Sequence, residues 1–331
     1  MSPPTASASE YCEGVLAGDR RSVAKTITLL ESRRPDHASL GHEILERLVA
    51  RSGNAVRVGI TGSPGVGKSS FIEALGMRLL AQDYRVAVLA VDPTSPVSGG
   101  SILGDKTRME RLAREEGAFI RPSPSGGTLG GVAHRTREAM LVCEAAGYEV
   151  VLVETVGVGQ SELEVASMVD FFCVLLQPGA GDELQGIKRG LLELADALVV
   201  NKWDGEQREL AARTCGDYSQ ALLLLRPPSR SWTPRAVTAS ALTGDGIDRF
   251  WEMVQEHREA LSSSGDLEAR RRDQALAWLW RLLDDGLQNA FRVHAEVARQ
   301  LPDLERAVRS LETAPLKAAR ALLDTFLDSS D

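Results

Sequence analysis

The chain has 331 residues, of which 43% are hydrophobic and 25% are charged. This length is enough for one large domain with helical additions, or for two domains. The formal net charge of −8 argues against a protein dedicated to nucleic acids or anionic membranes, so we expect neither as a partner.

The cysteines and the apolar runs indicate the compartment. The four cysteines lie far apart without paired spacing, which favours neither a disulfide framework nor a zinc site. No apolar run reaches the ~18–20 residues that a membrane span needs. Met1–Glu10 has neither the cationic start nor the apolar core of a signal peptide. We therefore expect a cytoplasmic protein.

The N-terminal part, residues 1–54, has helical periodicity. Apolar residues recur at three- and four-residue intervals over Ser22–Leu30 and Leu40–Val49, which predicts two helices. Asp19 and Ser39 are the expected N-caps of these helices, with a break between them at Pro35.

The middle part, residues 55–262, alternates short β-branched runs with helical stretches. Continuous apolar runs suit strands buried on both faces of a sheet, and the helices between them imply right-handed crossovers. The predicted fold class is therefore α/β, a doubly wound and mostly parallel sheet. The predicted strands are Val56–Ile60, Val86–Val91, Val150–Val153, Phe171–Leu176, Ala197–Val200 and Ala236–Thr238.

The C-terminal part, residues 263–331, is helical again, with breaks expected at Pro302 and Pro315. Its apolar stripe is too long for a solitary exposed helix and needs cover. The stripe includes Leu276, Leu283, Leu287 and Phe291. An isologous two-fold interface is the commonest solution, so we expect a helical dimerisation arm and a homodimer. Folding of this face back onto the middle domain is the alternative.

A complete phosphate-binding motif follows the first predicted strand. It reads Gly62, Ser63, Pro64, Gly65, Val66, Gly67, Lys68, Ser69, and Ser70 continues it into the next helix. Glycines let backbone N–H groups converge on one anion at the positive end of that helix. Lys68 is expected to reach the β- and γ-phosphates, and the Ser69 hydroxyl to bind Mg²⁺. A chance glycine-rich turn is the alternative.

Acidic residues near the ends of later strands are candidates for the same metal. Asp92 ends the second predicted strand, Asp105 lies in a glycine-rich loop, and Glu154 ends the third strand. Glu154 and Gly157 have the spacing of a metal-side carboxylate followed by a glycine that senses the γ-phosphate. The alternative is that these acids only cap turns.

The motif Asn201-Lys202-Trp203-Asp204 follows a buried strand and indicates that the protein selects guanine nucleotides. A carboxylate at Asp204 can accept both donors of the guanine edge, which adenine does not offer. Asn201 should brace the loops, and the stem of Lys202 can cover the base plane. The later segment Ser240, Ala241 and Leu242 supplies backbone N–H groups for guanine O6. The sequence therefore predicts a P-loop GTPase that binds GTP or GDP with Mg²⁺.

No glutamine directly follows Gly157 to orient water, so we expect slow hydrolysis that a partner accelerates. The loop Gln177–Arg189 holds candidate activating groups, Asp182, Lys188 and Arg189. The activating cation is Lys188 or Arg189, and we assign Asp182 and Lys188 to catalysis together with Lys68. A solvated loop before a helix is the alternative.

These residues resemble the MeaB/ArgK family, the methylmalonyl-CoA mutase-associated GTPases. The resemblance covers nearly the whole chain, and Ser98–Met109 is its most specific stretch. It implies a chaperone whose GTP cycle gates cofactor loading and protects an adenosylcobalamin-dependent methylmalonyl-CoA mutase. It also implies a homodimer built with the C-terminal helices.

Two alternatives belong to other classes of function. Related GTPases insert metals into other enzymes, and such proteins typically carry a His-rich or Cys-x-x-Cys-type metal-binding tract. In this chain the five histidines are scattered and the cysteines are not clustered. A nucleotide-switched scaffold, whose C-terminal helices do the binding, is the third interpretation. A protein kinase activity would need a kinase catalytic loop, and the motifs of this chain supply none.

Overall fold

The computed structural model describes residues 6–32, 34–91, 109–122, 129–155, 161–179, 189–225 and 227–328. They form two compact units, one that ends at Arg271 and one that starts at Arg272. The N-terminal helices belong to the first unit. The predicted division of the chain into three parts, with boundaries at residues 54/55 and 262/263, stays a prediction.

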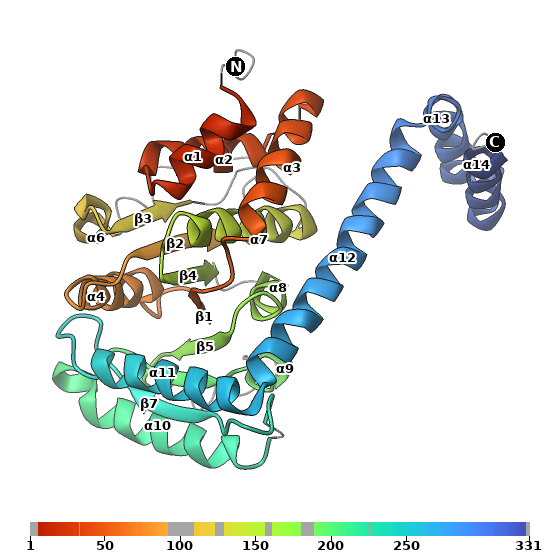
Figure 1. The fold of residues 1–331 in the computed structure, drawn as a ribbon. Helices are drawn as coiled ribbons and strands as arrows, with labels where there is room; N and C mark the ends of the chain where they lie inside the picture. The colour runs from red at the N-terminus through yellow and green to blue at the C-terminus, as the bar shows by residue number, and fades with distance from the viewer. Residues whose placement is uncertain are drawn as a thin grey trace. The chain divides into compact units, whose positions relative to one another are not determined.

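The first unit is built on a seven-stranded parallel sheet with the order β3-β2-β4-β1-β5-β6-β7 among the described residues (Figure 1). The strands are β1 (Val56–Gly62), β2 (Val86–Val91), β3 (Ala118–Arg121), β4 (Val150–Thr155), β5 (Phe171–Leu176), β6 (Ala197–Val200) and β7 (Arg235–Thr238). The predicted α/β class and its parallel sheet are confirmed. The edge strand β3 was not predicted, because its four residues form too short a run to stand out.

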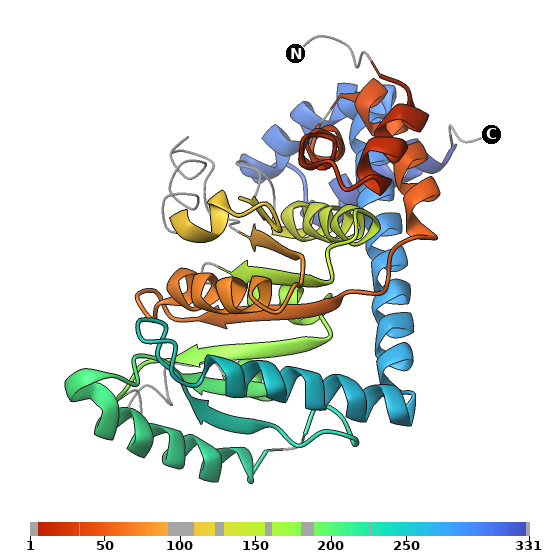
Figure 2. The same ribbon diagram turned by 60° about the vertical axis from the view of Figure 1, so that its left-hand side comes forward.

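Helices cover both faces of the sheet (Figure 2). Helices α4 (Lys68–Leu80), α6 (Glu110–Arg114) and α11 (Ile247–Ser264) share one apolar core with the strands, including Phe71 and Phe250 with ring centroids 5.1 Å apart. Helices α7 (Leu129–Ala145) and α8 (Ser161–Ala166) pack on β4. The short α9 (Arg189–Leu192) precedes β6, and α10 (Arg208–Leu222) packs on β6 and β7.

The N-terminal helices α1 (Ala8–Leu16), α2 (Arg20–Leu30) and α3 (Pro35–Val49) pack on one another and on α7. Asp19 caps α2 as predicted, with its carboxylate accepting from the backbone of Ser22 at 2.8 Å. The predicted cap at Ser39 is wrong, because α3 already begins at Pro35, whose fixed φ suits a first helical position. Helix α1 was not predicted.

The amino ends of the central strands are joined by a buried ionic network. Asp170 precedes β5 and accepts from Arg57 N at 3.1 Å and from Arg271 Nη2 at 2.6 Å. Asp196 precedes β6 and lies 3.1 Å from Arg270 Nη1 and 3.5 Å from His257 Nε2. Arg270 and Arg271 lie in the first turns of α12 (Asp266–Val293), so the start of this helix is fixed to the sheet.

The second unit contains the rest of α12 with α13 (Ala295–Arg309) and α14 (Pro315–Asp328). Phe291 and Phe326 pack edge to face at 5.5 Å. Pro315 starts α14 as expected, but the break predicted at Pro302 is wrong, because α13 continues through that residue. Within the part of the chain that the structure describes, no helix is long and apolar enough to cross a membrane.

Candidate functional site

The phosphate-binding motif lies where the central strand β1 meets α4. Three of its glycines have positive φ: 148° at Gly62, 80° at Gly65 and 93° at Gly67. At Gly67 an added Cβ would stand 2.8 Å from Asn201 Nδ2, so this position tolerates no side chain. The loop therefore curls around the amino end of α4, where backbone N–H groups and the helix dipole favour an anion.

Lys68 and Ser69 form the first turn of α4. Lys68 is buried, and its Nζ donates to the carbonyl oxygens of Gly62 at 2.8 Å and Ser63 at 3.1 Å. The ammonium thus lies directly over the loop whose N–H groups would surround a phosphate. Pro64 and Ser70 are exposed, and Val66 is buried beneath the loop.

Two of the predicted metal ligands, Ser69 and Glu154, lie together. Strand β4 lies beside β1, with Glu154 in register with Ile60, and this pairing brings the carboxylate to the loop. Ser69 Oγ donates to Glu154 Oε1 at 2.9 Å. A hydroxyl and a carboxylate oxygen at one point suit a hard cation such as Mg²⁺. The described residues contain no group of three or more His, Cys, Asp or Glu arranged to hold a metal, and two predicted ligands, Asp92 and Asp105, lie outside them.

The loops predicted to read the base lie at the carboxyl ends of β6 and β7. Asn201 is buried, its Nδ2 donates to Val66 O at 2.8 Å, and its Oδ1 accepts from Ala241 N at 3.1 Å. One side chain thus joins the phosphate loop to the Ser240–Leu242 segment. Asp204 accepts a hydrogen bond from Ser240 Oγ, which also accepts from Thr243 N at 3.1 Å.

Lys202 has a positive φ of 61°, in the left-handed region that residues other than glycine rarely adopt. The Leu242 side chain is 85% exposed. The side-chain contacts of these loops join Asn201 to Ala241 and Asp204 to Ser240, and Asn201 also to the phosphate loop.

Three contacts at the site were not predicted from the sequence. Thr155 Oγ1 donates to Thr61 Oγ1 at 2.6 Å and links β4 to β1 directly before the loop. Gln177 Nε2 lies 3.5 Å from Pro64 O. The Arg208 guanidinium stacks on the Trp203 ring at 4.1 Å. The sequence signal for the first two was their place at strand ends, since parallel strands bring their carboxyl ends to one edge.

The remaining predicted site residues lie outside the described residues. They are Asp92, Asp105, Gly157, Asp182 and Lys188. Their roles at the γ-phosphate, the metal and the activating loop stay predictions.

A glycine-rich loop between the central parallel strand and a helix, with a buried lysine at the first helical turn, defines a P-loop nucleotide-binding protein. The comparisons narrow this class. Residues 23–296 match the model of the family described as methylmalonyl-CoA mutase-associated GTPase MeaB. The chain therefore belongs to the MeaB family of GTPases, and the predicted family resemblance is confirmed.

Similar proteins span most of this chain. The GTPase ArgK of Escherichia coli is 47% identical over 317 residues, which cover 96% of each chain. The mouse protein named methylmalonic aciduria type A homolog, mitochondrial, is 45% identical over 95% of this chain and 78% of its own. A crystal structure of a LAO/AO transport system kinase is 39% identical with a TM-score of 0.76, covering 99% of this chain and all of that one.

Gly67→Ala tests the tight approach of the phosphate loop to Asn201. We expect the affinity for guanine nucleotide to fall about tenfold to a hundredfold, because the new methyl group meets Asn201 Nδ2 and a positive φ strains alanine. Isothermal titration calorimetry with GDP measures this affinity. Gly216→Ala in α10, where an added Cβ meets nothing within 4 Å, is the matched control and should bind as the parent does. Parental affinity in Gly67→Ala would contradict this placement of the loop.

Proposed function

We propose that this protein is a GTP-hydrolysing chaperone that gates cofactor loading of an adenosylcobalamin-dependent methylmalonyl-CoA mutase and protects that enzyme. The observation that carries the nucleotide part is the double contact of Asn201, which joins the phosphate loop to the base-reading loops. The mutase part is supported by the family description and by the name of the mouse relative. We also propose a cytoplasmic location, which fits the unpaired cysteine pattern.

Guanine is selected by Asp204 in this proposal. Its carboxylate would exchange the hydrogen bond from Ser240 Oγ for the N1–H and amino donors of guanine. Asn201 would hold the surrounding backbone in place, and the Lys202 stem would cover the base. N–H groups of the Ser240–Leu242 segment would face O6, with Ala241 N exchanging its bond to Asn201 Oδ1 and Ser240 N its bond to Asp245 O. Adenine would leave the carboxylate without these donors, which costs affinity.

Asp204→Asn should lose much of the preference for GTP over xanthosine triphosphate, because an amide cannot accept both guanine donors. We expect the ratio of the two affinities to fall by about two orders of magnitude, as for the loss of a charged hydrogen-bonding partner. Competition binding of the two nucleotides measures the ratio. Glu206→Gln, an exposed neighbouring acid, is the control. A ratio as high as in the parent would exclude Asp204 as the base reader.

We assign the metal to Mg²⁺, held by the Ser69 hydroxyl with Glu154, Asp92 and Asp105 on its carboxylate side. The contact between Ser69 and Glu154 supports this donor set. When bound, the ion would neutralise charge on the β- and γ-phosphates. This chain's own contribution is the Lys68 ammonium, which would leave the loop carbonyls for the phosphate oxygens, and the N–H of Gly157, which would sense the γ-phosphate.

Hydrolysis is proposed to be slow without a partner. No glutamine directly follows Gly157, so the attacking water lacks an assured orienting group. Gln177, at the start of the Gln177–Arg189 loop, lies beside Pro64 of the phosphate loop. A rearrangement of this loop by the mutase would therefore act next to the phosphates. Lys188 would then stabilise charge in the transition state, with Asp182 fixing the loop.

Addition of the mutase should accelerate GTP turnover, and Lys188→Ala should lose about tenfold or more of that stimulation. Its slow intrinsic rate should stay close to that of the parent. Phosphate release measured with and without apo- and holo-mutase separates the two rates. Arg51→Ala, an exposed cation on the turn after α3, is the control. Equal loss of both rates would indicate a structural role. Full stimulation in Lys188→Ala and in Arg189→Ala alike would place the activating group elsewhere.

We further propose that the C-terminal helices form a homodimer. Several large apolar side chains of α12 are more than one third exposed and favour burial against a second copy. They are Leu276, Leu279, Trp280, Leu282, Leu283 and Leu287.

Leu283→Glu combined with Leu287→Glu should convert the dimer to a monomer, because buried carboxylates at a two-fold interface are unpaired and repel one another. Light scattering measures the mass of the full-length chain. Leu224→Glu, which changes an 88% exposed leucine after α10, is the control and should leave the mass unchanged. A dimer that survives the double substitution would move the interface elsewhere.

A further inference from the structure

Strand β3 is the edge of the sheet on the side of the N-terminal helices, and among the described residues it pairs only with β2. Val86 N donates to Gly117 O at 2.9 Å, which fixes the register of this parallel pair. Alternate residues of a parallel strand bond to the same neighbour, so Phe119 and Arg121 face β2 with their backbone groups. The backbone N–H and C=O of Ile120 therefore point away from the sheet.

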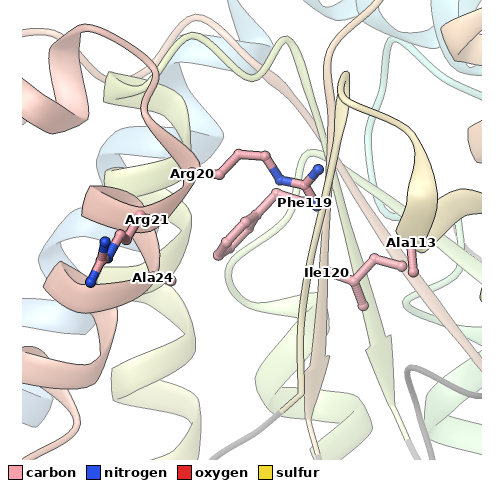
Figure 3. A pocket seen from close by; sticks show the side chains of 6 residues that line it. All are labelled: Arg20, Arg21, Ala24, Ala113, Phe119 and Ile120. Carbon is pink, nitrogen blue, oxygen red and sulfur yellow. The ribbon is translucent and has the colours of Figure 1, made fainter.

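A cleft of about 290 Å³ lies along this edge. It is lined from both faces of β3: Phe119 faces α2 on one side, and Ile120 faces Ala113 of α6 on the other (Figure 3). The Phe119 ring packs near Tyr148, at 5.9 Å, while Ile120 belongs to the core shared with α6. A cleft that spans both faces of an edge strand gives space for a further extended chain beside it.

Arginines supply the charge of the α2 wall. Arg20 and Arg21 line the cleft, and Figure 3 shows the Arg20 guanidinium extending from α2 toward the strand. Arg20 Nη1 donates to Glu115 O at 3.1 Å, which is a neutral acceptor. No described residue that lines the cleft is acidic. On a chain of net charge −8, this is a local cationic wall.

We propose that this cleft binds an extended acidic segment of a partner protein, which adds to β3 as a further strand. Main-chain hydrogen bonds to Ile120 would give affinity, and the alternating side chains of the segment would give specificity. Successive side chains of a strand point to opposite faces. The segment should therefore alternate acidic residues, on the side of Arg20, with small apolar residues, facing Ala113 and Ile120.

The test uses a fluorescein-labelled peptide of alternating glutamate and valine with the full-length protein. We expect saturable binding by fluorescence anisotropy and slower amide hydrogen exchange in Ala118–Arg121. The double variant Arg20→Glu, Arg21→Glu should weaken binding at least about tenfold, because two attractive charges become repulsive. Both residues lie in the first turn of α2, where glutamate favours the helix, so the variant should fold.

Two further variants separate the effect of charge from the effect of space in the cleft. Arg51→Glu, a charge reversal on the turn after α3, should bind as the parent does. Ala24→Leu narrows the cleft without reversing any charge and should also weaken binding. The double variant, Arg51→Glu and Ala24→Leu should all keep the parental affinity for GDP. A loss of peptide binding is then distinct from a defect of the nucleotide site.

Any of three results would overturn the proposal. Equal binding of a peptide with N-methyl groups at alternate residues would exclude main-chain pairing with β3. Equal binding of a peptide with lysine in place of glutamate would exclude the cationic wall as the source of selectivity. No binding of the glutamate peptide by the parent protein would remove the docking site altogether.

Discussion

The site depends on one buried amide, the side chain of Asn201. A carboxamide has a donor and an acceptor at the same end, so it can satisfy a carbonyl and an N–H at once. Asn201 does this between Val66 O of the phosphate loop and Ala241 N after β7. It is 1% exposed, where water does not compete for these bonds and an unpaired polar group would be costly. The spacing between the phosphate and base ends of the site is therefore set by this residue.

Strands β5 and β6 are fixed at their amino ends by charge. Asp170 and Asp196 precede β5 and β6 and receive Arg271 and Arg270 from the first turns of α12. Burial alone would raise the pKa of Asp196, but His257 and Arg270 outweigh it and hold the pKa below its ordinary value of 3.8. Because the folded-state pKa is lowered, this stabilisation is present above that value and is lost as the pH falls through the folded-state pKa. The start of α12 is thus part of the nucleotide-binding unit.

Much of the fold follows from local pattern, because strands buried on both faces read as uninterrupted apolar runs. Six of the seven strands were recognised in this way, whereas β3 has only Ala118–Arg121 and lies at the edge. Ser39 has the chemistry of a cap, but the fixed φ of Pro35 starts α3 earlier. The phosphate and base motifs were recognised because their chemistry requires fixed spacing. Contacts such as Thr61 with Thr155 depend on which strands become neighbours, and no local pattern carries that information.

The central claim is that these loops form one guanine-nucleotide site. Isothermal titration of the full-length protein with GDP and with ADP, both in the presence of Mg²⁺, tests it most directly. The account predicts one GDP per chain and an affinity for ADP at least about a hundredfold weaker, since adenine cannot satisfy Asp204. Equal affinities for the two nucleotides would contradict it.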